Sequence, residues 1–146
     1  MSLPIRELIA ALKQNHIVIL TNLEDINQMI SGSLEFSRKQ YLLVKPNLRS
    51  LQAIVFDHFQ LQNQDLYGRF KSDSSSEMGK EVEFLTQDLK EFKIKTLMFF
   101  DEHPADMGDI NPRNFKATFH IYSSQVHGRM SAEKDFLFPL LEKLVV

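Results

Sequence analysis

The chain has 146 residues, a length that fits one domain with its own core, and its formal net charge is −2 with basic and acidic residues interspersed. Hydrophobic residues make up 43% and charged residues 25%, which indicates a globular protein without a basic surface for nucleic acid. The absence of cysteine excludes disulfides, zinc–thiolate sites and cysteine nucleophiles and fits the cytoplasm, and no apolar run approaches the roughly 20 residues of a membrane span.

The first half of the chain shows two segments with the apolar spacing of helices. The first runs from about Pro4 to Met29. The short apolar segment from Leu34 to Val44 follows, and the sequence leaves open whether it is a separate helix or part of the next one. Pro46 then begins the second long helix, because proline suits a first turn. The two apolar faces carry Ile5, Leu8, Leu12, His16, Ile19, Leu23 and Ile26, and then Leu48, Leu51, Val55, His58, Gln62 and Leu66.

The second half shows two more such segments. Ser74 and Glu77 have the spacing of a capping box at the start of the third helix, and Asn111 caps the fourth helix at Pro112. Short connections make consecutive helices antiparallel neighbours. The sequence therefore predicts an all-α, up-down-up-down four-helix bundle as one domain over residues 1–146. The apolar faces of this half carry Val82, Leu85, Leu89, Phe92, Thr96 and Phe99, and then Phe115, Phe119, Tyr122, Val126, Arg129, Glu133, Phe136 or Leu137, and Leu140.

Polar residues interrupt these apolar faces near the middle of three helices: His16, His58, Gln62, Arg129 and Glu133. Histidine with a carboxylate one turn later holds metals in helical bundles, but Gln62 follows His58 at that spacing, and Arg129, which cannot bind a cation, precedes Glu133. We favour a buried ion pair of Arg129 with Glu133, with His16, His58 and Gln62 as its partners, because unpaired buried charges are costly. Two alternatives stay open: a mononuclear metal site of His16, His58 and Glu133, and a pocket for a small ligand.

The remaining histidines are expected at the surface. His120 and His127 share a face of the fourth helix outside its apolar stripe, and His103 lies next to Pro104 in a predicted loop. No nucleophile stands at a recognisable spacing from a base, so we expect no catalytic residues and no enzyme.

Some of the twelve phenylalanines fall outside the predicted apolar faces. An exposed apolar patch marks a partner surface, so we expect a protein partner rather than nucleic acid or a membrane. The candidates for this patch are Phe36, Phe59, Phe84, Phe100 and Phe138.

Three stretches resemble hemerythrin-like (HHE cation-binding) domains. LPIRELIAALKQNHIVIL resembles their opening helix, HFQLQNQDLY their second-helix motif, and RMSAEKDFLFPLL their fourth-helix ending. The stretch FKSDSSSEMGKEVEFL resembles a subgroup of these domains that is found in bacteria. The resemblance covers nearly the whole chain and implies a four-helix bundle that holds two irons.

This sequence departs from that pattern at the metal ligands. Gln62 stands in place of the bridging acid, Arg129 in place of the fourth-helix histidine, and the third helix has no histidine pair. The chain therefore resembles a degenerate member that kept the bundle and lost the di-iron centre, with weak iron binding as an alternative. Such a member is expected to be a non-enzymatic sensory or regulatory binding module.

A second resemblance leads to another function. FDHFQLQNQDLYGRF, TLMFFDE and GRMSAEKDFL are similar to helices of the Rsd/AlgQ anti-sigma regulators, which are also four-helix bundles. That family has an arginine four residues before a glutamate on its last helix, as Arg129 and Glu133 are here. The resemblance implies a protein-binding regulator of transcription.

Overall fold

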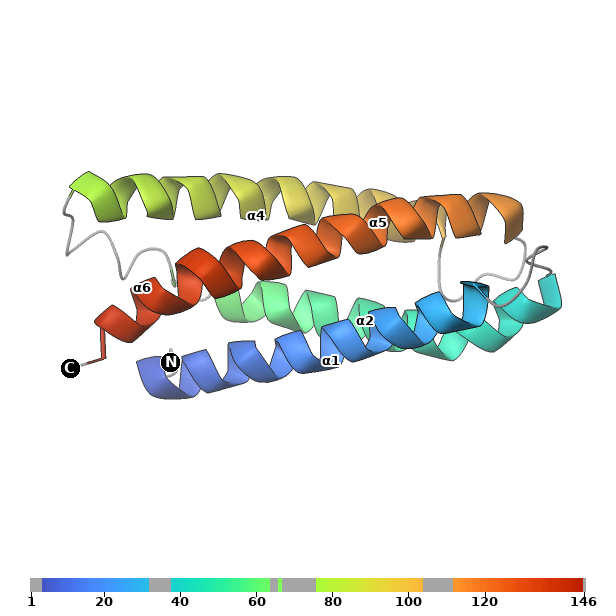
Figure 1. Cartoon of the computed structure of the whole chain (residues 1–146), viewed down its shortest axis with the longest axis horizontal. Coiled ribbons are helices and arrows are strands. Elements are labelled where there is room, and N and C mark those ends of the chain that lie inside the picture. The colour runs from blue at the N-terminus through green and yellow to red at the C-terminus, as the bar shows by residue number, and fades with distance from the viewer. Residues whose placement is uncertain (1–3, 32–37, 64–65, 67–75, 104–111, 146) are drawn as a thin grey trace.

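The computed structural model describes residues 4–31, 38–63, 66, 76–103 and 112–145. Four long helices lie side by side along the long axis of the molecule (Figure 1). The described ranges contain no strand, which confirms the predicted all-α class. The long helices are α1 (Ile5–Ser31), α2 (Arg38–Asn63), α4 (Ser76–Glu102) and α5 (Pro112–Ala132), and α5 continues into the π-helix η1 (Glu133–Leu137) and the short helix α6 (Phe138–Lys143).

The predicted apolar faces form the core. α1 packs mainly against α2 and α4 mainly against α5, and α1 also contacts α5 and α6. Every residue placed on those faces is buried except Ile5 and Val82, which are half-buried, and Phe136, which is exposed. The caps expected at Ser74 and Asn111 lie outside the described residues. Within the described ranges, no helix combines the length and the apolarity that crossing a bilayer requires.

The expected start of the second helix at Pro46 is wrong. α2 begins at Arg38 and contains Pro46, so the described part of the segment from Leu34 to Val44, Arg38–Val44, belongs to this helix. Proline inside a helix leaves the carbonyl four residues earlier without its usual donor. That carbonyl belongs to Leu42, and because Leu42 and Pro46 are both exposed, water can supply the missing hydrogen bond.

A π-helix, which the sequence did not predict, interrupts the last helix before Pro139. The backbone N–H of Phe138 donates to the carbonyl of Glu133, five residues earlier, and α6 then begins with Pro139 in its first turn. The wider turn spares the chain the clash that proline makes inside an α-helix. It also shifts the buried face by one residue, so that Leu137 and Phe138 are both buried and Phe136 is 44% exposed.

Three of the phenylalanines expected at the surface are buried. Phe84 is 51% exposed, but Phe59, Phe100 and Phe138 are only 5–6% exposed, and Phe36 lies outside the described residues. A helix that packs against two neighbours buries a stripe wider than a single column of residues. Phe59 illustrates this, because its ring centroid is 5.5 Å from that of Phe92 on α4.

The expectation that His103 is solvated is also wrong, whereas His120 and His127 are exposed as expected. His103 is 1% exposed, its Nε2 contacts the hydroxyl of Thr118, and its ring packs edge-on against Phe115. Burial lowers the pKa of His103 by disfavouring the charged ring, and the nearby carboxylate of Glu102 opposes this only in part.

The lowered pKa of His103 predicts a loss of stability in weak acid. In the window below about 6.5, the ordinary pKa of histidine, the unfolded chain binds a proton at this site that the folded chain does not, so stability falls as the pH falls. We expect His103→Gln to reduce the difference between urea midpoints at pH 7.5 and pH 5.5, and His120→Gln, the same change at an exposed position, is the matched control. An unreduced difference in the His103 variant would contradict this assignment.

Candidate functional site

A buried polar layer divides the core into two apolar clusters. One cluster includes Ile19, Val55 and Val126, and the other includes Leu12 and Leu66. Between them the structure brings together the five side chains singled out in the sequence. α1 contributes His16, α2 contributes His58 and Gln62, α5 contributes Arg129 and η1 contributes Glu133.

Glu133 is the centre of this polar layer. Its carboxylate is fully buried, at 0% exposure. Oε1 lies 2.6 Å from His16 Nε2 and 2.7 Å from His58 Nε2. Oε2 accepts hydrogen bonds from Gln62 Nε2 and Arg129 Nε, both at 2.7 Å. Four donors thus surround one carboxylate, which is what a buried charge requires.

Arg129 connects the layer to α4. One terminal nitrogen of the guanidinium donates to the backbone carbonyl of Leu85 at 2.9 Å and to Asp88 Oδ2 at 3.0 Å. The other donates to Gln62 Oε1 at 2.9 Å. The rigid fork of the guanidinium therefore joins three helices and the π-helix.

His58 contacts acceptors through both ring nitrogens. Its Nδ1 lies 2.9 Å from Asn15 Oδ1, and its Nε2 faces Glu133. Both ring nitrogens therefore have a polar partner, and the ionised Glu133 accepts from Nε2–H. Arg129 contacts both carboxylates of the layer, Glu133 and Asp88.

Asn15, Asp88 and the Leu85 carbonyl were missed in the sequence. Asn15 had a signal, since it lies seven residues after Leu8 on the same helical face and is 7% exposed. Asp88 lies one turn after Leu85, but its carboxylate is 32% exposed. In the sequence it therefore resembles an ordinary acidic residue of the surface. A backbone carbonyl as acceptor has no sequence signal.

The electrostatics of the layer keep Glu133 ionised. Burial by itself raises the pKa of this carboxyl, because it disfavours the charged form. The positive charge of His58, the hydrogen bonds from His16 and His58, and the charge of Arg129 outweigh burial and hold the pKa of Glu133 well below its ordinary value. A carboxylate held in this way is a structural anion rather than a proton acceptor at neutral pH.

A di-iron centre, which the sequence resemblance implies, does not fit these residues. Among the described residues, one group could hold a metal, and it consists of His16, His58 and Glu133. Ligands that share a metal at about 2.0–2.2 Å stand roughly 3 Å apart or more. The contacts of 2.6 and 2.7 Å between these histidines and Glu133 are instead hydrogen bonds.

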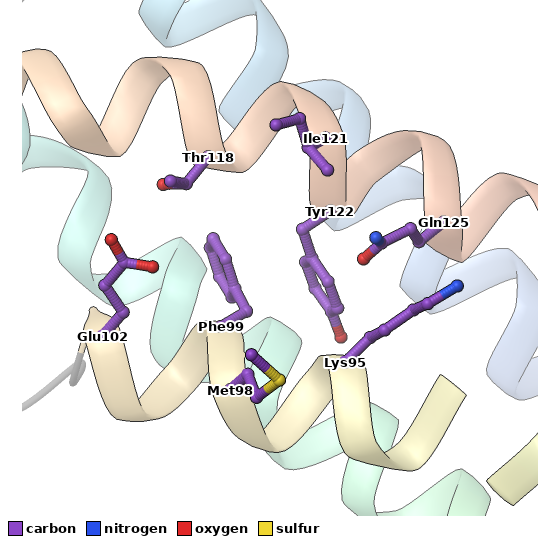
Figure 2. Close-up of a pocket in the computed structure, with 8 residues that line it drawn as sticks. All are labelled: Lys95, Met98, Phe99, Glu102, Thr118, Ile121, Tyr122 and Gln125. Atoms are coloured by element: carbon purple, nitrogen blue, oxygen red, sulfur yellow. The ribbon is translucent and has the colours of Figure 1, made fainter. Parts of the chain in front are cut away.

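A shallow groove with a volume of about 170 Å³ runs between α4 and α5, away from the polar layer. Figure 2 shows the rings of Phe99 and Tyr122 at its base, and their centroids are 4.4 Å apart in a stacked arrangement. Met98 and Ile121 flank the groove and are 66% and 62% exposed. The groove is too small for most organic ligands but presents apolar side chains to a larger partner.

Comparisons of the chain with protein-family models, with curated proteins and with solved structures found no match.

Proposed function

We propose that the protein is a non-enzymatic sensory or regulatory binding module of the cytoplasm, built on a hemerythrin-like, up-down-up-down bundle. The observation that carries the proposal is the pairing of Arg129 with Glu133, at 2.7 Å and with both residues buried. This pair occupies the position at which the resemblance expects metal ligands. The fold is retained while the chemistry of a di-iron centre has no place to occur.

The state of Glu133 supports a role without catalysis. A general base needs a pKa near the working pH and a free oxygen within reach of a substrate. Glu133 has a strongly lowered pKa, and both of its oxygens accept two contacts each from neighbouring side chains. The carboxylate therefore serves to neutralise and connect the helices.

Ferrous iron tests this proposal directly. Protein loaded with ferrous iron without oxygen and then exposed to air is expected to show no oxo-bridge absorption band and no oxygen uptake beyond that of buffer with iron. Apohemerythrin treated in the same way is the positive control. A band that appears in proportion to the protein would overturn the proposal.

A second candidate function is the binding of one metal ion. The ligand atoms of His16, His58 and Glu133 lie within 4.8 Å of one another, and Asn15 holds the outer nitrogen of His58 as metal-site partners do. An ion would require these side chains to separate by roughly half an ångström to reach ordinary ligand spacing. One tightly bound ion per chain, without an oxo-bridge band, would favour this candidate.

A third candidate is a protein-binding regulator of the anti-sigma type. Its support is the groove of Figure 2 together with an adjoining pocket of about 260 Å³, and Lys95 lines both of them. Asp88 is paired with Arg129, and the two remaining carboxylates, Glu91 and Glu102, outnumber Lys95 along this surface, so a basic amphipathic helix of a sigma factor is the partner it fits. Capture of RNA polymerase sigma factor that Met98→Asp abolishes would favour this candidate.

A further inference from the structure

A second pocket opens at the surface directly beside the polar layer, between α1 and the segment formed by η1 and α6. Its volume is about 390 Å³, which lies within the usual range for small-ligand pockets. The polar layer reaches this pocket through one side chain, His16, which belongs both to the pocket lining and to the hydrogen-bonded cluster.

His16 forms a polar spot at the base of the pocket. The residue is 9% exposed, and its Nε2 is engaged with Glu133. The other ring nitrogen, Nδ1, has no hydrogen-bond partner among the described residues. The ring also packs against Phe138 at a centroid distance of 4.9 Å, so a polar group and an aromatic face adjoin here.

The rim of the pocket is cationic. Lys13 and Lys134 both line it, and Glu142 is the one carboxylate in the lining. Lys13 contacts Glu142 at 3.2 Å, but both side chains are at least half exposed, so this pair is weak and can rearrange. Two ammonium groups against one carboxylate favour an anionic ligand over a cationic one.

The walls of the pocket are apolar. Ile17 is 60% exposed although it lies beside a buried histidine, and Leu20 and Phe138 complete an apolar lining. The π-helix positions this wall, since the extra residue in its turn buries Phe138 while Lys134 remains exposed. Such π-helical turns occur frequently at functional sites.

We propose that this pocket binds a small organic carboxylate with an apolar body, such as a medium-chain fatty acid. The carboxylate would pair with Lys134 and Lys13 near His16, and the hydrocarbon would cover Ile17 and Phe138. The inference rests on the proposed function as a binding module and names the class of its ligand. Because His16 also contacts Glu133, an occupied pocket is connected to every helix that the polar layer joins.

Octanoate, at concentrations below its micelle range, is the probe that tests this inference. Titration followed by amide NMR is expected to give saturable shifts around His16, Ile17 and Lys134. Octanol and octyltrimethylammonium, which share the chain but not the negative charge, are expected to bind at least about tenfold more weakly, a difference of about 1.4 kcal/mol. Equal binding of octanoate and octanol would overturn the inference, because it would show apolar adsorption only.

Matched charge reversals locate the site. Lys134→Glu is expected to weaken octanoate binding by at least about tenfold, whereas Lys90→Glu, the same change on an exposed position of α4, leaves it unchanged. Both substitutions are at the surface and leave folding intact. Ile17→Asp is a further variant that removes the apolar wall and is expected to abolish binding.

Equal effects of the two lysine variants, or no octanoate binding at millimolar concentration, would overturn the carboxylate assignment. That failure is distinguishable from failure of the proposed function, which an oxo-bridge band after iron loading would reveal.

Discussion

Replacing Arg129 by alanine is expected to lower the free energy of unfolding by about 3–5 kcal/mol, because the change leaves a buried charge without its partner. Arg129 is 2% exposed, and its loss removes donors to Glu133, Gln62, Asp88 and the Leu85 carbonyl. Urea denaturation monitored by circular dichroism measures the effect.

A double variant separates the ion pair from the packing of Arg129. In Arg129→Met with Glu133→Leu, both charges are replaced by apolar groups, so the variant is expected to be more stable than the sum of the two single losses implies. Coupling of about 0.5–3 kcal/mol is ordinary for residues in contact. Strict additivity, or an Arg129→Ala variant as stable as the parent protein, would show that the pair does not hold the layer together.

Replacing Phe119 by alanine is expected to cost about 3–5 kcal/mol, because the substitution leaves a cavity in a packed aromatic cluster. Phe119 is 0% exposed, and its ring lies 5.7 Å from that of Phe115 and 6.1 Å from that of Phe99. The same denaturation experiment measures the loss.

Phe84→Ala is the matched control for this prediction. Phe84 is 51% exposed and its ring contacts Phe136, which is also exposed. Surface substitutions usually change stability by about 0.5 kcal/mol or less. Equal losses in the Phe84 and Phe119 variants would contradict the assignment of the core.

The periodic pattern of apolar residues predicted the helices well but failed at two prolines. Pro46 resembles the first residue of a helix, yet α2 already starts at Arg38. Proline is tolerated there because the carbonyl it leaves unpaired faces water, and a pattern of residue types does not show which carbonyls water reaches. At Pro139 the pattern failed because it did not predict the π-helix that precedes this residue. Whether one turn of a helix widens is decided by packing rather than by local preference.

The polar layer was predictable in its members but not in its connections. Arg129 and Glu133 interrupt an apolar face one turn apart, and an unpaired buried charge is so costly that their pairing follows. Which carboxylate oxygen meets which histidine depends on the rotation of three separate helices. His103 shows the same limit, since its burial depends on the packing of Phe115 and Thr118 from α5.

The number of metal ions bound per chain tests whether Arg129 and Glu133 close the core as an ion pair. Protein purified without chelators and then offered ferrous iron and zinc is measured by elemental analysis after the unbound metal is removed. We expect no bound metal, because Arg129 and the hydrogen bonds to Glu133 occupy the position of the ligands. Two irons per chain would contradict this account, and a single tightly held ion would show that His16, His58 and Glu133 form a metal site instead.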